Sequence, residues 1–178
     1  MLNELERLFR ALNPMEKSFD MGETVFRRNQ SVSSLYFVLS GHASLIRHRE
    51  DGVELVLQRA GIGKVLAEAS LFSDRYHCDA RAGESTVLLQ VNRSRLIDLL
   101  QSDPALSMLW LESLSHSVQQ ARTRAEIISL RTVRERLDAW LLMNGESLPE
   151  KGQWKRMAAE LAVSPEALYR ELAARKNS

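Results

Sequence analysis

The chain has 178 residues, of which 44% are hydrophobic and 26% charged, and its formal net charge is +1. This composition supports a hydrophobic core and excludes a disordered or disulfide-stabilised small chain. The balanced charge excludes no class of partner, because a local basic patch is compatible with a small total. The single cysteine, Cys78, excludes an internal disulfide and is typical of a reducing compartment. No apolar run approaches the roughly 20 residues that span a bilayer, so we expect a soluble, cytoplasmic protein without a membrane partner.

The N-terminal half predicts one amphipathic helix followed by many short strands. Leu2, Leu5, Leu8, Phe9 and Leu12 share one helical face, and Asn13-Pro14 ends that helix. Segments rich in β-forming residues and separated by glycine then follow at residues 24–28, 35–39, 43–48, 53–58, 76–82 and 85–91. Asp51-Gly52 is the strongest hairpin signal, and residues 66–72 predict a short helical turn. This spacing favours an antiparallel barrel or jelly roll, and with the helices that follow it predicts an α+β fold.

A long helix is expected between the strands and the C-terminal segment. Ser94 is the expected N-cap of a helix over residues 95–101, and Asp103-Pro104 is a second helix start. The next helix carries apolar residues at alternating steps of three and four, the pattern of a coiled-coil seam. Its members are Leu111, Leu114, Val118, Ala121, Ala125 and Ile128. We therefore expect a homodimer; the alternative is a helix that packs only on its own chain.

The C-terminal segment predicts a helix over residues 131–143 and then a helix-turn-helix. Its two short helices cover residues 153–161 and 165–176, with Ser164 as the cap of the second. Leu168 and Leu172 would face inward, leaving Glu166, Tyr169, Arg170 and Lys176 outward. Arginine bonds guanine bidentately and glutamate accepts from cytosine, so Arg170 and Glu166 are candidate base readers of double-stranded DNA. The candidates for phosphate contact are Lys151, Lys155, Arg156 and Arg175. The alternative is a helical hairpin whose charges form a solvated face with an i,i+4 ion pair.

The loop GIGKVLAEASLFSDRYHCDARA is the candidate ligand site. Glu68 is placed to bond a ribose hydroxyl, and Arg75 or Arg81 to hold a phosphate. The alternative is that Leu66, Leu71 and Phe72 simply plug the barrel.

No metal site or enzyme is expected. His77 adjoins Cys78, but neighbours on a strand point to opposite faces and so do not readily share one ion. A buried, apolar role for Cys78 is favoured. The chain has no nucleophile elbow, P-loop or paired catalytic carboxylates. A metal-dependent jelly-roll enzyme is a third functional hypothesis, and it would require bound metal, which elemental analysis would detect.

The stretches GETVFRRNQSVSSLYFVLSGHASL and DGVELVLQRAGIGKVLAEASLF, with the long helix and the helix-turn-helix, resemble the bacterial CRP/FNR family of transcription regulators. The resemblance covers nearly the whole chain. It implies a cyclic-nucleotide-binding-like β-roll over residues 1–102, a dimerisation helix over 103–130 and a DNA-binding domain over 131–178. It further implies dimers that bind palindromic operators under the control of an effector in the β-roll, with RNA polymerase as a candidate partner.

Several positions depart from the family pattern. The glycine of the G-E-L-x-L loop is Ala67, the acid is kept as Glu68, and the Arg-Ser pair at the phosphate is Cys78 and Asp79. A carboxylate at the phosphate position would repel an anion, so cyclic AMP is not expected to bind in the usual manner, and the effector and any cofactor stay unidentified.

The DNA-reading segment departs as well. The family's base-reading positions correspond to Pro165, Glu166 and Arg170, and proline replaces the usual arginine or other polar residue. The family's wing would follow Lys176 and is missing or truncated. These departures favour the alternative of a ligand-binding or protein-interaction module that keeps the fold and has lost DNA binding.

Overall fold

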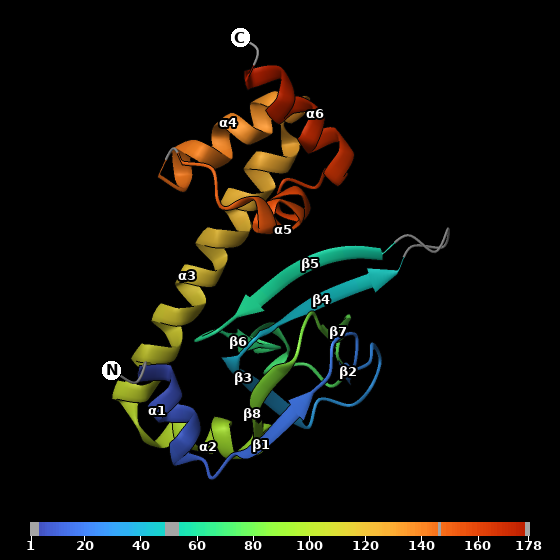
Figure 1. Cartoon of the computed structure of the whole chain (residues 1–178). Coiled ribbons are helices and arrows are strands. Elements are labelled where there is room, and N and C mark those ends of the chain that lie inside the picture. The colour runs from blue at the N-terminus through green and yellow to red at the C-terminus, as the bar shows by residue number, and fades with distance from the viewer. Residues whose placement is uncertain (1–3, 49–53, 146, 177–178) are drawn as a thin grey trace. The chain divides into compact units, whose positions relative to one another are not determined.

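The computed structural model describes residues 4–48, 54–145 and 147–176 (Figure 1). The chain divides into two compact units, Met1–Leu114 and Ser115–Ser178, and the boundary falls inside the long helix α3 (Pro104–Ser129). Each unit has its own hydrophobic core, so each is described separately.

Two four-stranded antiparallel sheets form the first unit. One has the order β1-β8-β3-β6 and the other β2-β7-β4-β5. The first sheet contains β1 (Met15–Phe19), β8 (Thr86–Asn92), β3 (Ser34–Ser40) and β6 (Val65–Leu66). The second contains β2 (Thr24–Phe26), β7 (Asp79–Ala82), β4 (His42–His48) and β5 (Glu54–Gly61). The predicted antiparallel roll and the α+β class are confirmed.

The apolar run of β3 is explained by burial on both of its faces. Tyr36 and Val38 belong to the core that joins the two sheets. Leu35 and Phe37 belong to a second core, shared with α1 (Glu4–Ala11) and α2 (Arg93–Ser102). A strand covered on both faces needs no polar alternation, so the prediction of a buried strand is confirmed.

Strands β4 and β5 pair antiparallel, as the predicted hairpin requires. His48 pairs with Glu54 at its end, and Asp51-Gly52 themselves lie outside the described residues. Strand β1 was not predicted, because MEKSF is almost wholly exposed at the edge of its sheet and so lacks the apolar alternation that marks a strand.

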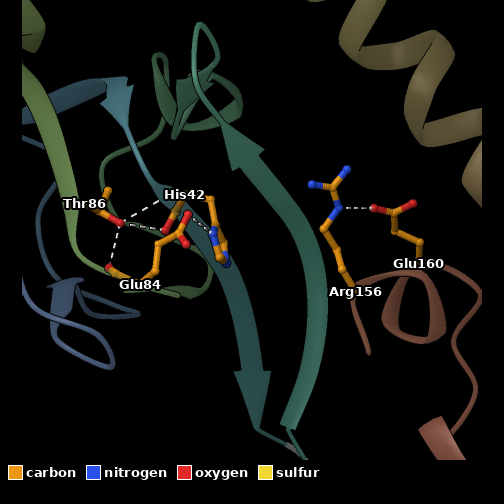
Figure 2. Close-up of polar contacts among 5 residues, drawn as sticks. All are labelled: His42, Glu84, Thr86, Arg156 and Glu160. Carbon is orange, nitrogen blue, oxygen red and sulfur yellow. Dashed lines mark hydrogen bonds and ion pairs between the residues drawn. The ribbon is translucent and has the colours of Figure 1, made fainter. Parts of the chain in front are cut away.

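A hydrogen-bonded turn cluster fixes the start of β4 against the loop between β7 and β8 (Figure 2). His42 Nδ1 lies 2.9 Å from Glu84 Oε1, and the buried Thr86 hydroxyl lies 2.9 Å from the His42 carbonyl oxygen. A Cβ on Gly83 would overlap His42 Nε2, so a larger residue here would displace that imidazole. The cluster therefore joins the start of β4 to the loop between β7 and β8.

Side-chain caps set the starts of both helices that follow the roll. The expected cap Ser94 is wrong: Asn92 caps α2, accepting hydrogen bonds from the Ser94 and Arg95 N–H groups at 2.9 and 3.4 Å. Ser94 lies inside the first turn, where its hydroxyl donates to the same Asn92 oxygen at 2.7 Å. Asp103 caps α3 as expected, accepting from Ala105 N–H at 2.9 Å.

The second unit is helical. After the last part of α3 it contains α4 (Val133–Met143), a short 3-10 turn η2 (Lys151–Gln153), α5 (Trp154–Glu160) and α6 (Pro165–Lys176). These elements share one core, made of Ile127, Leu137, Met157, Ala158, Leu161, Leu168 and Leu172. Within the described part of the chain, no helix combines the length and the hydrophobicity needed to cross a membrane.

We predict that Asn92→Ala lowers the free energy of unfolding by about 1 kcal/mol, because two N–H groups of the first turn lose their acceptor. Ser94→Ala should cost less, because Ser94 only donates to the cap. Urea unfolding of both variants measures the difference, and a larger loss for Ser94→Ala would contradict the assignment of the cap.

Candidate functional site

The second helix of the helix-turn-helix, α6, presents a polar outer face. Ser164 accepts a hydrogen bond from Ala167 N–H at 3.2 Å, and Pro165 occupies the first helical position. Leu168 and Leu172 are buried, as predicted. The side chains left exposed are Glu166, Tyr169 and Arg170, while the Lys176 side chain lies outside the described residues.

Glu166 is suited to accept hydrogen bonds. Its pKa is lowered by a hydrogen bond from its own backbone N–H, then by Ser164, with a smaller effect of the Arg170 charge. No ion pair joins Glu166 to Arg170 among the described side chains, so both charged groups remain available on the outer face.

The basic residues predicted to contact phosphate differ in whether they already form ion pairs within the unit. Lys151 and Lys155 are exposed. Arg156 Nε lies 3.2 Å from Glu160 Oε1, which Figure 2 shows. Arg175 lies 2.8 Å from Asp138 and 2.8 Å from Glu171, so its charge is already neutralised within the unit. Arg175 is therefore a structural residue here, which its spacing in the sequence did not indicate.

One arginine that sequence reasoning missed joins the turn of the helix-turn-helix to α3. Arg136, half-buried on α4, donates from Nε to the Leu130 carbonyl at 2.9 Å. Its Nη1 donates to the carbonyls of Leu161 and Ala162 at 3.0 and 3.1 Å. These carbonyls follow the ends of α3 and α5, where the last carbonyl oxygens of a helix lack N–H donors and a cation is favoured. No local pattern distinguishes Arg136 from the neighbouring surface charges.

The apolar stripe of α3 is uncovered in the single chain. Leu111, Val118 and Ile128 are 53%, 48% and 39% exposed, and Ala121 and Ala125 are exposed as well. Leu114 differs, because it is half-buried against the core of the first unit. Met108, three residues before Leu111, is 66% exposed and lengthens the stripe.

The loop of the roll brings Ala67, Glu68 and Cys78 together. Ala67 has a left-handed backbone, with φ 72°, at the start of the short 3-10 turn η1 (Glu68–Ser70). Ala67 and Cys78 belong to the same core. Glu68 Oε1 accepts a hydrogen bond from Gln58 Nε2 at 3.0 Å, whereas its buried Oε2 has no hydrogen-bond partner among the described residues. Desolvation raises the Glu68 pKa, so its charged form is unfavourable without a partner.

Asp79 does not join this group. It lies on the opposite face of the strand from Cys78, where Oδ1 accepts from Arg28 N–H at 2.7 Å and Oδ2 lies 3.6 Å from His48 Nδ1. The Asp79 carboxylate is therefore held on the outer face of the strand, but its charge still acts on the Cys78 thiol and raises its pKa. Cys78 is buried, as predicted, and burial raises its pKa to about 11, so the thiol is neutral.

The two arginines predicted to hold a phosphate are engaged elsewhere. Arg81 lies 2.8 Å from Glu54, and Arg75 Nη1 donates to the Asn29 carbonyl at 2.6 Å. Both predictions are corrected, because strand alternation directs Arg81 outward and the Asn29 carbonyl holds Arg75. Of the three residues predicted to plug the roll, Leu66 and Leu71 are buried and Phe72 is 79% exposed. Across the described residues, no group of three histidine, cysteine or acidic side chains is arranged to hold a metal.

The chain is similar to known proteins in both sequence and fold. Residues 16–103 match the cyclic nucleotide-binding domain family. The structure of FixK2 from Bradyrhizobium japonicum has a TM-score of 0.76 and 18% identity, covering 92% of this chain and 85% of that one. The structure of the c-di-GMP responsive global regulator CLP of Xanthomonas campestris has a TM-score of 0.72 and 23% identity. The match covers 96% of this chain and 90% of that one. At these identities the two structures show the fold: a β-roll followed by a helical unit.

Curated relatives with similar sequences are transcription regulators. The global nitrogen regulator of Nostoc is 29% identical over 137 residues, which are 75% of this chain and 61% of that protein. The cAMP-activated global transcriptional regulator CRP of Haemophilus influenzae is 23% identical over 129 residues, 71% of this chain and 57% of that protein. These similarities support the resemblance to the CRP/FNR family of transcription regulators that the sequence predicted. The chain spans about three fifths of the length of these relatives.

We predict that Glu68→Gln changes how stability depends on pH. Because the folded-state pKa of Glu68 is raised, its favourable contribution is complete below the unfolded pKa of about 4.3 and is lost as pH rises through the folded value. The stability of the wild type relative to the variant should therefore fall as pH rises. Urea unfolding across that range measures it, with Glu112→Gln on the exposed surface of α3 as the matched control. A constant difference between wild type and Glu68→Gln would contradict the prediction.

Proposed function

We propose that this protein is a homodimeric, DNA-binding transcription regulator that works in the cytoplasm and is controlled by an effector in its β-roll. The observation that carries the proposal is the exposed polar face of α6, on a helix whose inner face is fully packed. A recognition helix needs this combination, because packing fixes its direction while the outer side chains reach base edges.

Arg170 and Glu166 read the bases in this proposal. Arg170 donates to guanine, and Glu166, ionised at neutral pH, accepts from cytosine N4. The proposed contacts to the phosphate backbone come from Tyr169, Lys155, Arg156 and Lys176. Arg156 would exchange its ion pair with Glu160 for one with a phosphate.

The uncovered stripe of α3 forms the dimer seam. Two parallel helices would bury the exposed apolar side chains against each other, and the small Ala121 and Ala125 would allow close approach. The twofold axis of such a dimer would place two copies of α6 on a twofold-symmetric duplex. RNA polymerase is a candidate further partner of the assembled complex.

A second candidate function is a sensor or interaction module of the same fold without DNA binding. Pro165 favours it, because proline has neither a side-chain donor nor a backbone N–H at the first reading position. Affinity for random duplex DNA, measured against salt concentration, separates the two candidates. The regulator should show a log-linear loss of affinity with salt, as counterion release requires.

We predict that Arg170→Ala weakens binding to the preferred duplex by about 1–3 kcal/mol and relaxes the preference for guanine at one position. The preferred duplex is first selected from a random library with the wild type, and gel shifts then compare the variants. Lys155→Ala is the control: it should weaken binding evenly across sequences and lower the salt slope by about 1. Unchanged base preference in Arg170→Ala would exclude this residue as a reader.

We predict that Val118→Lys yields monomers, because a buried pair of like charges would replace apolar contacts in the seam. Val118 is chosen because it is exposed in the single chain, so the change leaves the core of either unit intact. Gln120→Lys, off the seam on the same helix, is the matched control and should stay dimeric. If sedimentation shows that Val118→Lys is still a dimer, the assignment of the dimer seam to α3 is contradicted.

A further inference from the structure

The inner face of β4 ends in an arginine that lies close to Cys78. Ala43 and Leu45 point into the roll core, and alternation along β4 places Arg47 on that same face, past the last core residue. The ladder between β4 and β7 pairs Ile46 with Asp79, so Arg47 falls beside Cys78. Arg47 Nη2 donates to the His77 carbonyl at 3.1 Å, which fixes the guanidinium at this point.

Arg47 is available for an anion. It is exposed, and no carboxylate among the described residues forms an ion pair with it. The neutral Cys78 thiol does not compete for it, although its electrostatic contact with Arg47 shows that the two groups are near. Asp79 accepts from Arg28 N–H on the outer face and forms no ion pair with Arg47 among the described residues, although its charge also acts on Cys78.

The Glu68 carboxylate is a hydrogen-bond acceptor whose charge also acts on Cys78. Glu68 Oε2 is buried and has no partner among the described residues, while Gln58 holds the other carboxylate oxygen at 3.0 Å. An unpaired buried carboxylate oxygen is costly, and a ligand hydroxyl or amino group would relieve that cost.

We propose that Arg47, on β4, supplies the cation of the effector site in place of the arginine that the family pattern puts at position 78. The ligand is then a small organic anion, a phosphate or a carboxylate, that carries a hydroxyl or amino donor. Arg47 binds the anionic oxygens and Glu68 accepts from the donor. This inference rests on the proposed control of the protein by an effector in the roll.

The test is calorimetric titration of the full chain with cyclic AMP and, separately, with malate. Cyclic AMP combines a phosphate with a ribose hydroxyl, and malate combines carboxylates with a hydroxyl, so the two arms separate the two sources of anion. We expect at least one of them to bind with a Kd tighter than about 1 mM. Arg47→Gln should weaken that binding about tenfold or more, because it removes a charge-assisted hydrogen bond. Arg47→Lys should retain part of the affinity.

Arg81→Gln is the matched control, because it removes the same charge from a neighbouring strand but on the outer face. It should bind the probe as the wild type does, and thermal melting should show all variants folded. Wild-type affinity in Arg47→Gln, an equal loss in Arg81→Gln, or no binding of either probe to the wild type would each overturn the proposal.

Binding of random duplex DNA by the same variants tests the proposed DNA-binding function separately from the proposed effector site. Arg47→Gln should keep the wild-type duplex affinity. Probe binding that depends on Arg47, in a chain that binds no duplex, would support the effector site and overturn the DNA-binding function.

Discussion

Arg136 makes the contact on which the geometry of the second unit depends. Its guanidinium donates to the Leu130 carbonyl after α3 and to the Leu161 and Ala162 carbonyls at the turn before α6. A planar group with several fixed donors satisfies such a set better than a lysine would. Three hydrogen bonds of one side chain therefore join the end of α3 to the turn that precedes α6. The Arg124 Nη2 bond to the Ala159 carbonyl, at 3.4 Å, adds a second link between α3 and α5.

The two functional surfaces are places where the single chain leaves groups unsatisfied. The stripe on α3 exposes apolar side chains that a folded monomer would ordinarily cover. Glu68 keeps a buried carboxylate oxygen without a partner among the described residues. In the function proposed above, a second copy would cover the apolar stripe and a ligand donor would pair with the carboxylate oxygen. The proposed partner and the proposed effector would thus supply two different kinds of missing interaction.

Periodicity in the sequence predicted most of the fold. The β3 run, the caps Asp103 and Ser164, and the inward Leu168 and Leu172 all follow from local pattern, because each reports its own burial or its own first turn. Periodicity did not predict strand β1, because its side chains are mostly exposed. The prediction of the α2 cap was wrong because Asn92 and Ser94 are both good capping residues two positions apart. Only the backbone conformation decides between them.

The candidate sites were harder to predict, because their residues meet across elements. Sequence motif alone placed Asp79 against a ligand anion and gave the arginine role to Arg75 or Arg81. Strand alternation separates these residues: Cys78 faces the core, Asp79 and Arg81 face outward, and Arg47 reaches the inner face from the adjacent strand. The loss of arginine at position 78 therefore does not by itself remove positive charge from the roll. A motif records which position carries a charge, whereas a ligand meets the summed charge of all strands that share a face, and in this roll two strands contribute to it.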